Sequence, residues 1–397
     1  MSQMQPNYTG ATPRNQIRIA TESFEQSADQ IAKCATQCRY DPWRVRVMDA
    51  QRASVHFVDT LEEAGALESA TLVLQANGFA FTTAQNAALR DRSAEIVSPY
   101  SLTVDGSKDT PLRRRSAQLF YEDQLIFEFD VLRLCEIMSA PSLWYFERKD
   151  SDGNPLPEKV FVNPVVNCAF RCKPCSRLSF LNGHRGYLEN IERMMAEISA
   201  QVPNRDELQV VNVSTGSLPT AKEDFEVFKA IIESFRRKEF HRARFSIATS
   251  SLFDDSQLRQ LKGLGVERLS VTMDGTSDDV LAKLYHGKGR GTVTGYSEMI
   301  KRVEGLFSLV AIHLILGHDS TDTIKRNVAR LASQSQAAIH HYIPRIFHPH
   351  QYSILHPEAI EKGLVYYVDL FRFIDDLNDE RMQPMNLCNP FYGLQGD

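Results

Sequence analysis

Along the second half of the chain, short apolar runs alternate with longer amphipathic segments. Each run is seven to nine residues long and rich in Val, Ile and Leu, which predicts a buried strand. Each is followed by a segment in which apolar residues recur every three or four positions, which predicts a helix. The six apolar runs fall at 160–166, 208–214, 243–249, 266–274, 308–316 and 337–343. This alternation is typical of parallel βαβ units with right-handed crossovers, in an open barrel or a doubly wound sheet.

The first part of the chain has a different pattern. Residues 1–155 show no regular strand–helix alternation, but strand-rich pieces at 70–83 and 117–132 with helical stretches between them. The polar Gly/Pro segment 151–158 marks a boundary. We therefore predict an N-terminal α+β domain over 1–155, with substrate recognition or a lid as its expected role. The α/β barrel would span 156–350, and a C-terminal helix and tail 351–397.

Three of the seven cysteines fall within eight residues, directly after the first predicted strand of the second domain. Cys168, Cys172 and Cys175 have the spacing C-x3-C-x2-C. Chemistry in parallel α/β folds sits at the carboxyl ends of the strands, and these cysteines lie at that end. The pattern predicts a metal or cluster site in this loop.

Two kinds of site fit three clustered thiols. Thiolates bind soft or borderline metals, and an iron–sulfur cluster held by three of them keeps one iron open for another ligand. A structural zinc ion instead requires a fourth protein ligand, which His184 could supply as a Cys3His site. The spacing by itself leaves both open and favours the cluster.

Composition and charge narrow the class of protein. The formal net charge of −5 gives no global basic field for nucleic acid or an anionic membrane, and no basic groove with interleaved aromatic residues is present. No apolar run approaches the length of a membrane span, and residues 1–16 lack the order of a secretion signal. We expect a cytoplasmic, reducing location, which also suits an odd number of cysteines.

At this point the chain resembles the radical S-adenosylmethionine (SAM) superfamily over about residues 160–345. The signature of that superfamily is C-x3-C-x2-C in the loop after the first strand of a partial (β/α)6 barrel. Three further stretches are similar to it: a turn at 214–220 after the second strand, the passage 248–276, and the glycine-containing stretch 312–324. Two positions depart from the family pattern. Pro174 stands where an aromatic residue is common, and Leu218 stands in place of the usual Glu.

The resemblance implies a [4Fe-4S] cluster held by Cys168, Cys172 and Cys175, with SAM on the open iron. One electron from an external donor such as flavodoxin or ferredoxin would cleave SAM into methionine and a 5′-deoxyadenosyl radical. That radical would abstract a hydrogen from a small-molecule or peptide substrate. The methionine end of SAM is expected at the turn, its ribose at the end of the third strand, and its adenine beside Gly317. The expected SAM-binding residues are Ser214, Thr215, Gly216, Ser217, Pro219, Thr249, Ser250 and Gly317.

Histidines are concentrated near the end of the barrel. Five of the eleven fall between His340 and His356, in a segment interrupted by prolines. No pair has the His-x3-His spacing that would place two ligands on one helix face. We interpret these histidines as loop residues.

Overall fold

We describe the protein from a computed structural model. It describes residues 155–165, 168–175, 186–285, 291–342 and 354–379, and ahead of them the strands between residues 56 and 149. His184, the possible fourth ligand of a zinc site, lies outside the described residues.

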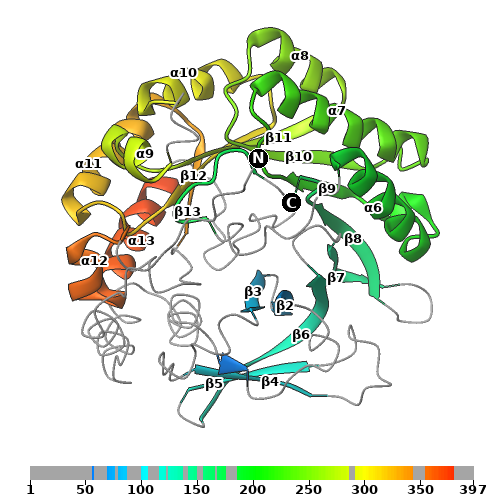
Figure 1. Cartoon of the computed structure of the whole chain (residues 1–397), viewed down its shortest axis with the longest axis horizontal. Coiled ribbons are helices and arrows are strands. Elements are labelled where there is room, and N and C mark those ends of the chain that lie inside the picture. Colours follow the sequence, from blue (N-terminus) through cyan, green and yellow to red (C-terminus); the bar gives the residue numbers. More distant parts are fainter. Residues whose placement is uncertain are drawn as a thin grey trace, which may run out of the picture.

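The second domain is built on one curved sheet of seven strands (Figure 1). In spatial order these are β13 (Ala338–Tyr342), β12 (Leu309–Ile315), β11 (Val266–Asp274), β10 (Arg244–Thr249), β9 (Val210–Ser214), β8 (Pro155–Val162) and β7 (Ser142–Lys149). Neighbours from β8 to β13 pair in parallel, which confirms the six predicted strands. The order follows the sequence, so the sheet winds in one direction as a partial barrel. The sequence pattern did not reveal β7, which adds to the edge of β8 in antiparallel orientation.

Helices cover the outside of this sheet (Figure 1). They are α6 (Tyr187–Gln201), α7 (Ala221–Arg237), α8 (Asp255–Gly263), α9 (Asp278–Leu284), α10 (Val293–Val303), α11 (Thr321–Gln334), α12 (Pro357–Lys362) and α13 (Leu364–Asp379). Two of them begin with reciprocal capping boxes: Thr220 with Glu223 at α7, and Asp254 with Gln257 at α8. These side chains satisfy backbone N–H groups that a helix start leaves without partners, so they fix where each helix begins.

The two faces of the parallel strands differ in chemistry. One face carries branched apolar residues such as Val213, Ile247 and Leu269, which are buried in the core with the apolar sides of the helices. The other face carries a row of small residues in register across five strands: Ser214, Ala248, Ser270, Ala311 and Ala338. Since successive side chains on a strand point to opposite faces, the small row lies on the concave, inner face of the barrel.

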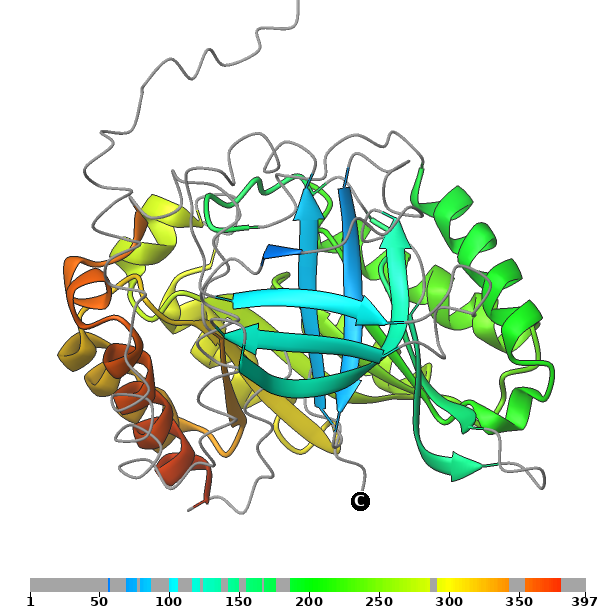
Figure 2. The same ribbon diagram turned by 90° about the horizontal axis from the view of Figure 1, so that it is seen from below.

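The first domain contributes a second sheet of six strands. They are β1 (His56–Phe57), β4 (Tyr100–Asp105), β5 (Ser116–Tyr121), β6 (Gln124–Glu136), β2 (Ser69–Ala76) and β3 (Phe79–Asn86), in that spatial order. All pairs are antiparallel except β1 with β4. Figures 1 and 2 show this sheet on the open side of the partial barrel, opposite the helices.

The C-terminal helix differs from our expectation. The pattern over 358–377 predicts one long helix, but α12 ends at Lys362 and α13 begins at Leu364. Gly363 between them has φ 51° and ψ −127°, a conformation that residues with a Cβ avoid. The break lets α13 lie against the barrel, where Asn378 exchanges two hydrogen bonds of 2.8 and 2.9 Å with the backbone of Ile339 in β13. Within the described residues, no helix is long and apolar enough to cross a membrane.

Gly363→Ala should destabilise the protein by about 1–3 kcal/mol, because alanine would have to adopt a backbone conformation that is disfavoured for residues with a Cβ. Urea denaturation measures the change. Gly263→Ala is the matched control: Gly263 lies in α8, and an added Cβ meets nothing within 4 Å. The control should be neutral or slightly stabilising. Equal effects of the two variants would contradict this account of the break.

Candidate functional site

The cysteine loop follows β8 at the carboxyl edge of the sheet. Cys172 is buried, and Cys168 and Cys175 are partly buried. None of the three is disulfide-bonded. Arg171 has a positive φ of 46°, and the N–H of Cys175 donates to the carbonyl of Cys172 at 3.0 Å. The loop therefore makes two sharp bends that bring three thiols to the end of the first barrel strand.

The turn after β9 holds this loop by backbone contacts. The N–H of Ser217 donates to Sγ of Cys168 at 3.3 Å, and the carbonyl of Ser217 accepts from the N–H of Ala169 at 2.8 Å. Just before the loop, Val165 donates to the Thr215 hydroxyl at 2.9 Å and accepts from the Gly216 N–H at 3.1 Å. The turn predicted to bind SAM and the loop predicted to bind the cluster thus form one hydrogen-bonded unit.

The far side of the cysteine loop rests on α9. The N–H of Lys173 donates to the carbonyl of Leu284 at the end of this helix, at 2.9 Å. The next residue, Tyr285, is fully buried, and burial together with Asp274, Cys172 and Cys175 raises its pKa well above the usual value. Asp274 ends β11 with φ 65°, and the N–H of Gly275 donates to the Met273 carbonyl across it. Asp274 is therefore a turn residue, and Tyr285 lies within electrostatic reach of Asp274 and of the thiols of Cys172 and Cys175.

The expected ribose residues lie at the end of β10. Thr249 is buried, and its hydroxyl accepts from the N–H of Ser251 at 3.0 Å. The hydroxyl of Ser250 is 2.7 Å from that of Thr272 on β11, and its carbonyl accepts from the Tyr296 hydroxyl. Both side chains hold the strand end in shape, and only Ser250 is partly exposed toward solvent or a ligand.

Our sequence analysis missed Asp224, in the first turn of α7. Its carboxylate is 2% exposed, accepts from the N–H of Leu218 at 2.6 Å and forms a hydrogen bond with the hydroxyl of Ser251. A third hydrogen bond comes from the side chain of Ser217. Burial raises the pKa of Asp224 to about 6, although these hydrogen bonds oppose the shift. One signal in the sequence could have revealed it: the helical periodicity of α7 places this acid on the apolar side of the helix.

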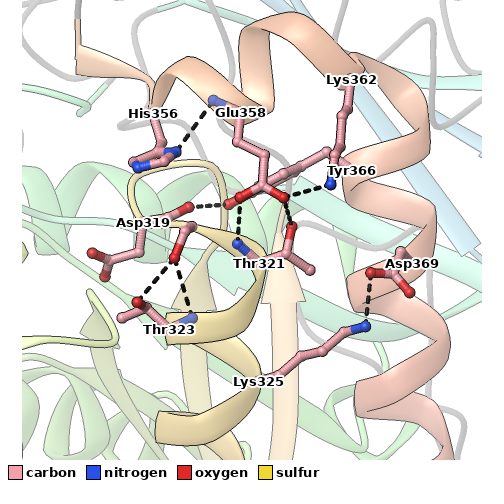
Figure 3. A network of polar contacts seen from close by, with 10 residues as sticks. Asp319, Thr321, Thr323, Lys325, His356, Glu358, Lys362, Tyr366 and Asp369 are labelled. Carbon is pink, nitrogen blue, oxygen red and sulfur yellow. Dashed lines mark hydrogen bonds and ion pairs between the residues drawn. The ribbon is translucent and has the colours of Figure 1, made fainter.

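The stretch after β12 is supported by the C-terminal helices. Gly317 is buried with φ 99°, and its carbonyl accepts from the N–H of His356 at 2.8 Å. Glu358 in α12 accepts from both the N–H and the hydroxyl of Thr321 at the start of α11, and Lys362 lies 2.6 Å from the same carboxylate (Figure 3). Because these contacts converge around residues 317–321, α12 and its N-cap support the expected adenine side of the site.

Histidines occupy the barrel wall. His313 on β12 is stacked on its neighbour His340 on β13, with ring centroids 5.3 Å apart. Burial lowers the pKa of His340 to about 4, so this imidazole is neutral at physiological pH. Our interpretation of the histidines as loop residues is wrong for His340 and His341, which lie in β13. His356 caps α12 by accepting from the N–H of Glu358.

Residues 162–330 match the family model described as the radical SAM superfamily. This match identifies residues 162–330 as a radical SAM segment. The matched segment runs from the end of β8 through the cysteine loop to α11. The superfamily implies a [4Fe-4S] cluster and SAM as cofactors.

Several solved structures are similar to this chain at low identity. Coproporphyrinogen III oxidase (HemN) from Escherichia coli is 14% identical, with 55% of this chain and 52% of that chain covered and a TM-score of 0.40. TsrM, a methyltransferase from Kitasatospora setae, is 14% identical (50% and 40% covered, TM-score 0.37). SuiB from Streptococcus suis is 13% identical (56% and 47% covered, TM-score 0.37). The chain spans between 40% and 52% of the length of these proteins. No curated protein sequence matches it.

The loop suits the cluster that this superfamily implies. An amide N–H directed at a cysteine sulfur, as from Ser217 to Cys168, stabilises the negative charge that a cluster places on its ligands. Within the part of the chain that the structure describes, no three His, Cys, Asp or Glu side chains form a group that could hold a metal ion. A cluster does not require its thiolates to meet at one ion, because each binds its own iron. His184, the fourth ligand of the zinc alternative, is outside the described residues.

The buried charge of Asp224 should appear in the pH dependence of stability. Its pKa of about 6 in the folded protein lies above the usual 3.8, so its stabilising contribution is complete below pH 3.8 and lost as the pH rises through 6. Asp224→Asn removes this titration. Between pH 4 and pH 7 the parent protein should lose roughly 2.4 kcal/mol relative to the variant. Urea denaturation across this pH range measures the difference in unfolding free energy. If the free energies of the parent protein and the variant changed equally with pH, the raised pKa of Asp224 would be refuted.

Glu358 should make the folding stability depend on pH in the opposite direction: its contribution is lost as the pH falls. Hydrogen bonds from Lys362 and Thr321 lower its pKa to about 2 from the usual 4.5, so its contribution is present above pH 4.5 and lost as the pH falls through 2. On acidification from pH 5 to pH 3, the melting temperature of the parent protein should fall more than that of Glu358→Gln, by about 2–4 °C. Glu361→Gln, at an exposed position of the same helix, is the control and should follow the parent protein.

Proposed function

We propose that this protein is a radical SAM enzyme that cleaves SAM reductively and abstracts a hydrogen from a small-molecule or peptide substrate. When bound, the cluster supplies one electron to the sulfonium of SAM, which gives methionine and a 5′-deoxyadenosyl radical. We assign Cys168, Cys172 and Cys175 as the cluster ligands. The observation that carries this proposal is the backbone of Ser217, whose N–H donates to Cys168 Sγ and whose carbonyl accepts from the N–H of Ala169. It joins the thiols to the turn at which the methionine end of SAM is expected.

The proposed SAM pocket follows the carboxyl edge of the sheet. The turn formed by Ser214, Thr215, Gly216, Ser217 and Pro219 would face the amino acid end of SAM. Leu218 provides no carboxylate there, so backbone groups of the turn would make more of the contacts. Thr249 and Ser250 at the end of β10 would lie beside the ribose, with Ser250 offering the accessible hydroxyl. Gly317, whose positive φ bends the chain after β12, would leave room for the adenine.

The substrate would enter the inner side of the barrel, under the row of small residues. On the wall there, the His340 imidazole is neutral at physiological pH and packs beside the ring of His313. The sheet of residues 1–155 lies on the open side of the barrel in Figures 1 and 2, which supports a role in recognising or covering the substrate. A buried wall would also keep water and stray hydrogen donors from the radical.

We further propose a cytoplasmic enzyme reduced by a flavodoxin or ferredoxin. Three thiols without a disulfide suit a reducing compartment. The net charge of −5 and the lack of a basic, aromatic-rich groove in the sequence disfavour nucleic acid as the substrate.

The first test is formation of 5′-deoxyadenosine. The protein is purified without oxygen, its iron and sulfide are reconstituted, and SAM and dithionite are added. The parent protein should form a [4Fe-4S] cluster and 5′-deoxyadenosine, whereas the triple variant Cys168→Ala, Cys172→Ala, Cys175→Ala should form neither, because it lacks every proposed ligand.

Two controls make this test specific. Cys388→Ala changes a cysteine distant in sequence and should retain the cluster. One tightly bound zinc per chain, lost in His184→Ala, would instead support the structural zinc site. A colourless protein after reconstitution, with no iron bound, would contradict the proposal.

A further inference from the structure

One buried carboxylate connects three segments that the proposed function brings together at SAM. Asp224 Oδ1 accepts from the N–H of Leu218 in the turn after β9, and Oδ2 is bonded to the hydroxyl of Ser251 after β10. Through the neighbouring Ser217 peptide, the same turn holds Cys168 and Ala169 of the cysteine loop. Between them, these segments are expected to contact the cluster, the methionine end and the ribose.

We propose that Asp224 is a positioning residue that couples the methionine end of the SAM pocket to its ribose end. This inference rests on the proposed function of the site. Asp224 is 2% exposed, so it acts through the backbone it holds rather than by touching SAM. Loss of its carboxylate should release the Leu218 amide and the Ser251 hydroxyl together, and thereby loosen both halves of the pocket.

The carboxylate of Asp224 is not required to cap the N-terminus of helix α7. The start of this helix is already satisfied by Thr220 and Glu223, whose side chains and backbone groups bond reciprocally. Asp224 follows this capping box and directs both oxygens away from the helix, toward the turn and the β10 end. Its neighbours on α7 that point inward are apolar, including Phe225 and Phe228. A buried acid among them disfavours folding at neutral pH, which is the pattern expected where function opposes stability.

The donors around Asp224 explain why an acid suits this position. The Leu218 N–H is fixed in the backbone and always needs an acceptor, and two serine hydroxyls also bond to the carboxylate. An ionised carboxylate accepts on both oxygens. An asparagine keeps one acceptor but presents an amide N–H to the remaining hydroxyl, so it should retain part of the arrangement. Alanine retains none of it.

The first experiment needs neither cluster nor SAM. Hydrogen–deuterium exchange is measured on the metal-free full-length protein for the peptide that contains Leu218. In Asp224→Ala this peptide should exchange about tenfold faster or more, the effect of losing a buried hydrogen bond to a charged group. Asp224→Asn should fall between Ala and the parent. Asn378→Ala is the matched control: Asn378 is also a buried side chain with two backbone hydrogen bonds, but at β13.

The second experiment measures SAM on the reconstituted protein. The dissociation constant of SAM and its effect on the electron paramagnetic resonance spectrum of the reduced cluster are compared across variants. Asp224→Ala should bind SAM at least about tenfold more weakly, with its cluster content unchanged. Asp224→Asn should bind SAM with an affinity between those of Asp224→Ala and the parent protein. Ser251→Ala, which removes only the β10 contact, should have a smaller effect. Asn378→Ala should bind SAM like the parent protein.

The outcomes separate this inference from the proposed function. Unchanged exchange at Leu218 in Asp224→Ala would overturn the coupling, even if the parent protein cleaves SAM. Faster exchange together with unchanged SAM affinity would also overturn it. A parent protein that binds no SAM would refute the proposed function instead, while the exchange experiment would still report whether Asp224 holds the turn.

Discussion

The structure of the site depends on the backbone of one residue, Ser217. Its N–H is directed at a cysteine sulfur and its carbonyl accepts from the same loop, so a short turn after the second barrel strand determines where the first strand's loop can lie. Parallel pairing of β8 with β9 brings the two segments to the same edge of the sheet. The contacts of Asp224 with the turn and of Leu284 with the loop then reinforce an arrangement that the sheet has already set up.

Much of the barrel could be predicted from the sequence, because its strands and helices have strong and different periodicities. Strand β11 was predicted with its observed bounds, since it is a clean apolar run that ends at a turn residue. The division of the chain at residues 155 and 350 stays a prediction. The antiparallel strand β7 joins the barrel sheet ahead of the first boundary, and α13 packs against the last strand beyond the second.

What could not be predicted arises from contacts between distant segments. The break at Gly363 was hidden because the apolar pattern continues across it, and only the packing of α13 on β13 requires the bend. Asp224 looked like an ordinary acid in the first turn of a helix, where negative charge is common. Its importance comes from Leu218 and Ser251, which local sequence patterns do not bring near it. The cysteines were found easily because their chemistry is local.

The anchoring of the cysteine loop on both sides links the position of the three thiols to the stability of the barrel. The loop backbone is held by hydrogen bonds from Ala169 to Ser217 and from Lys173 to Leu284. Small metal domains often fold only when the ion binds, so that metal affinity and folding are one equilibrium. In this protein the partners of the loop belong to other segments of a large barrel with its own apolar core. A substitution in that core, far from any thiol, can therefore disturb the cysteine loop through the segments that hold it.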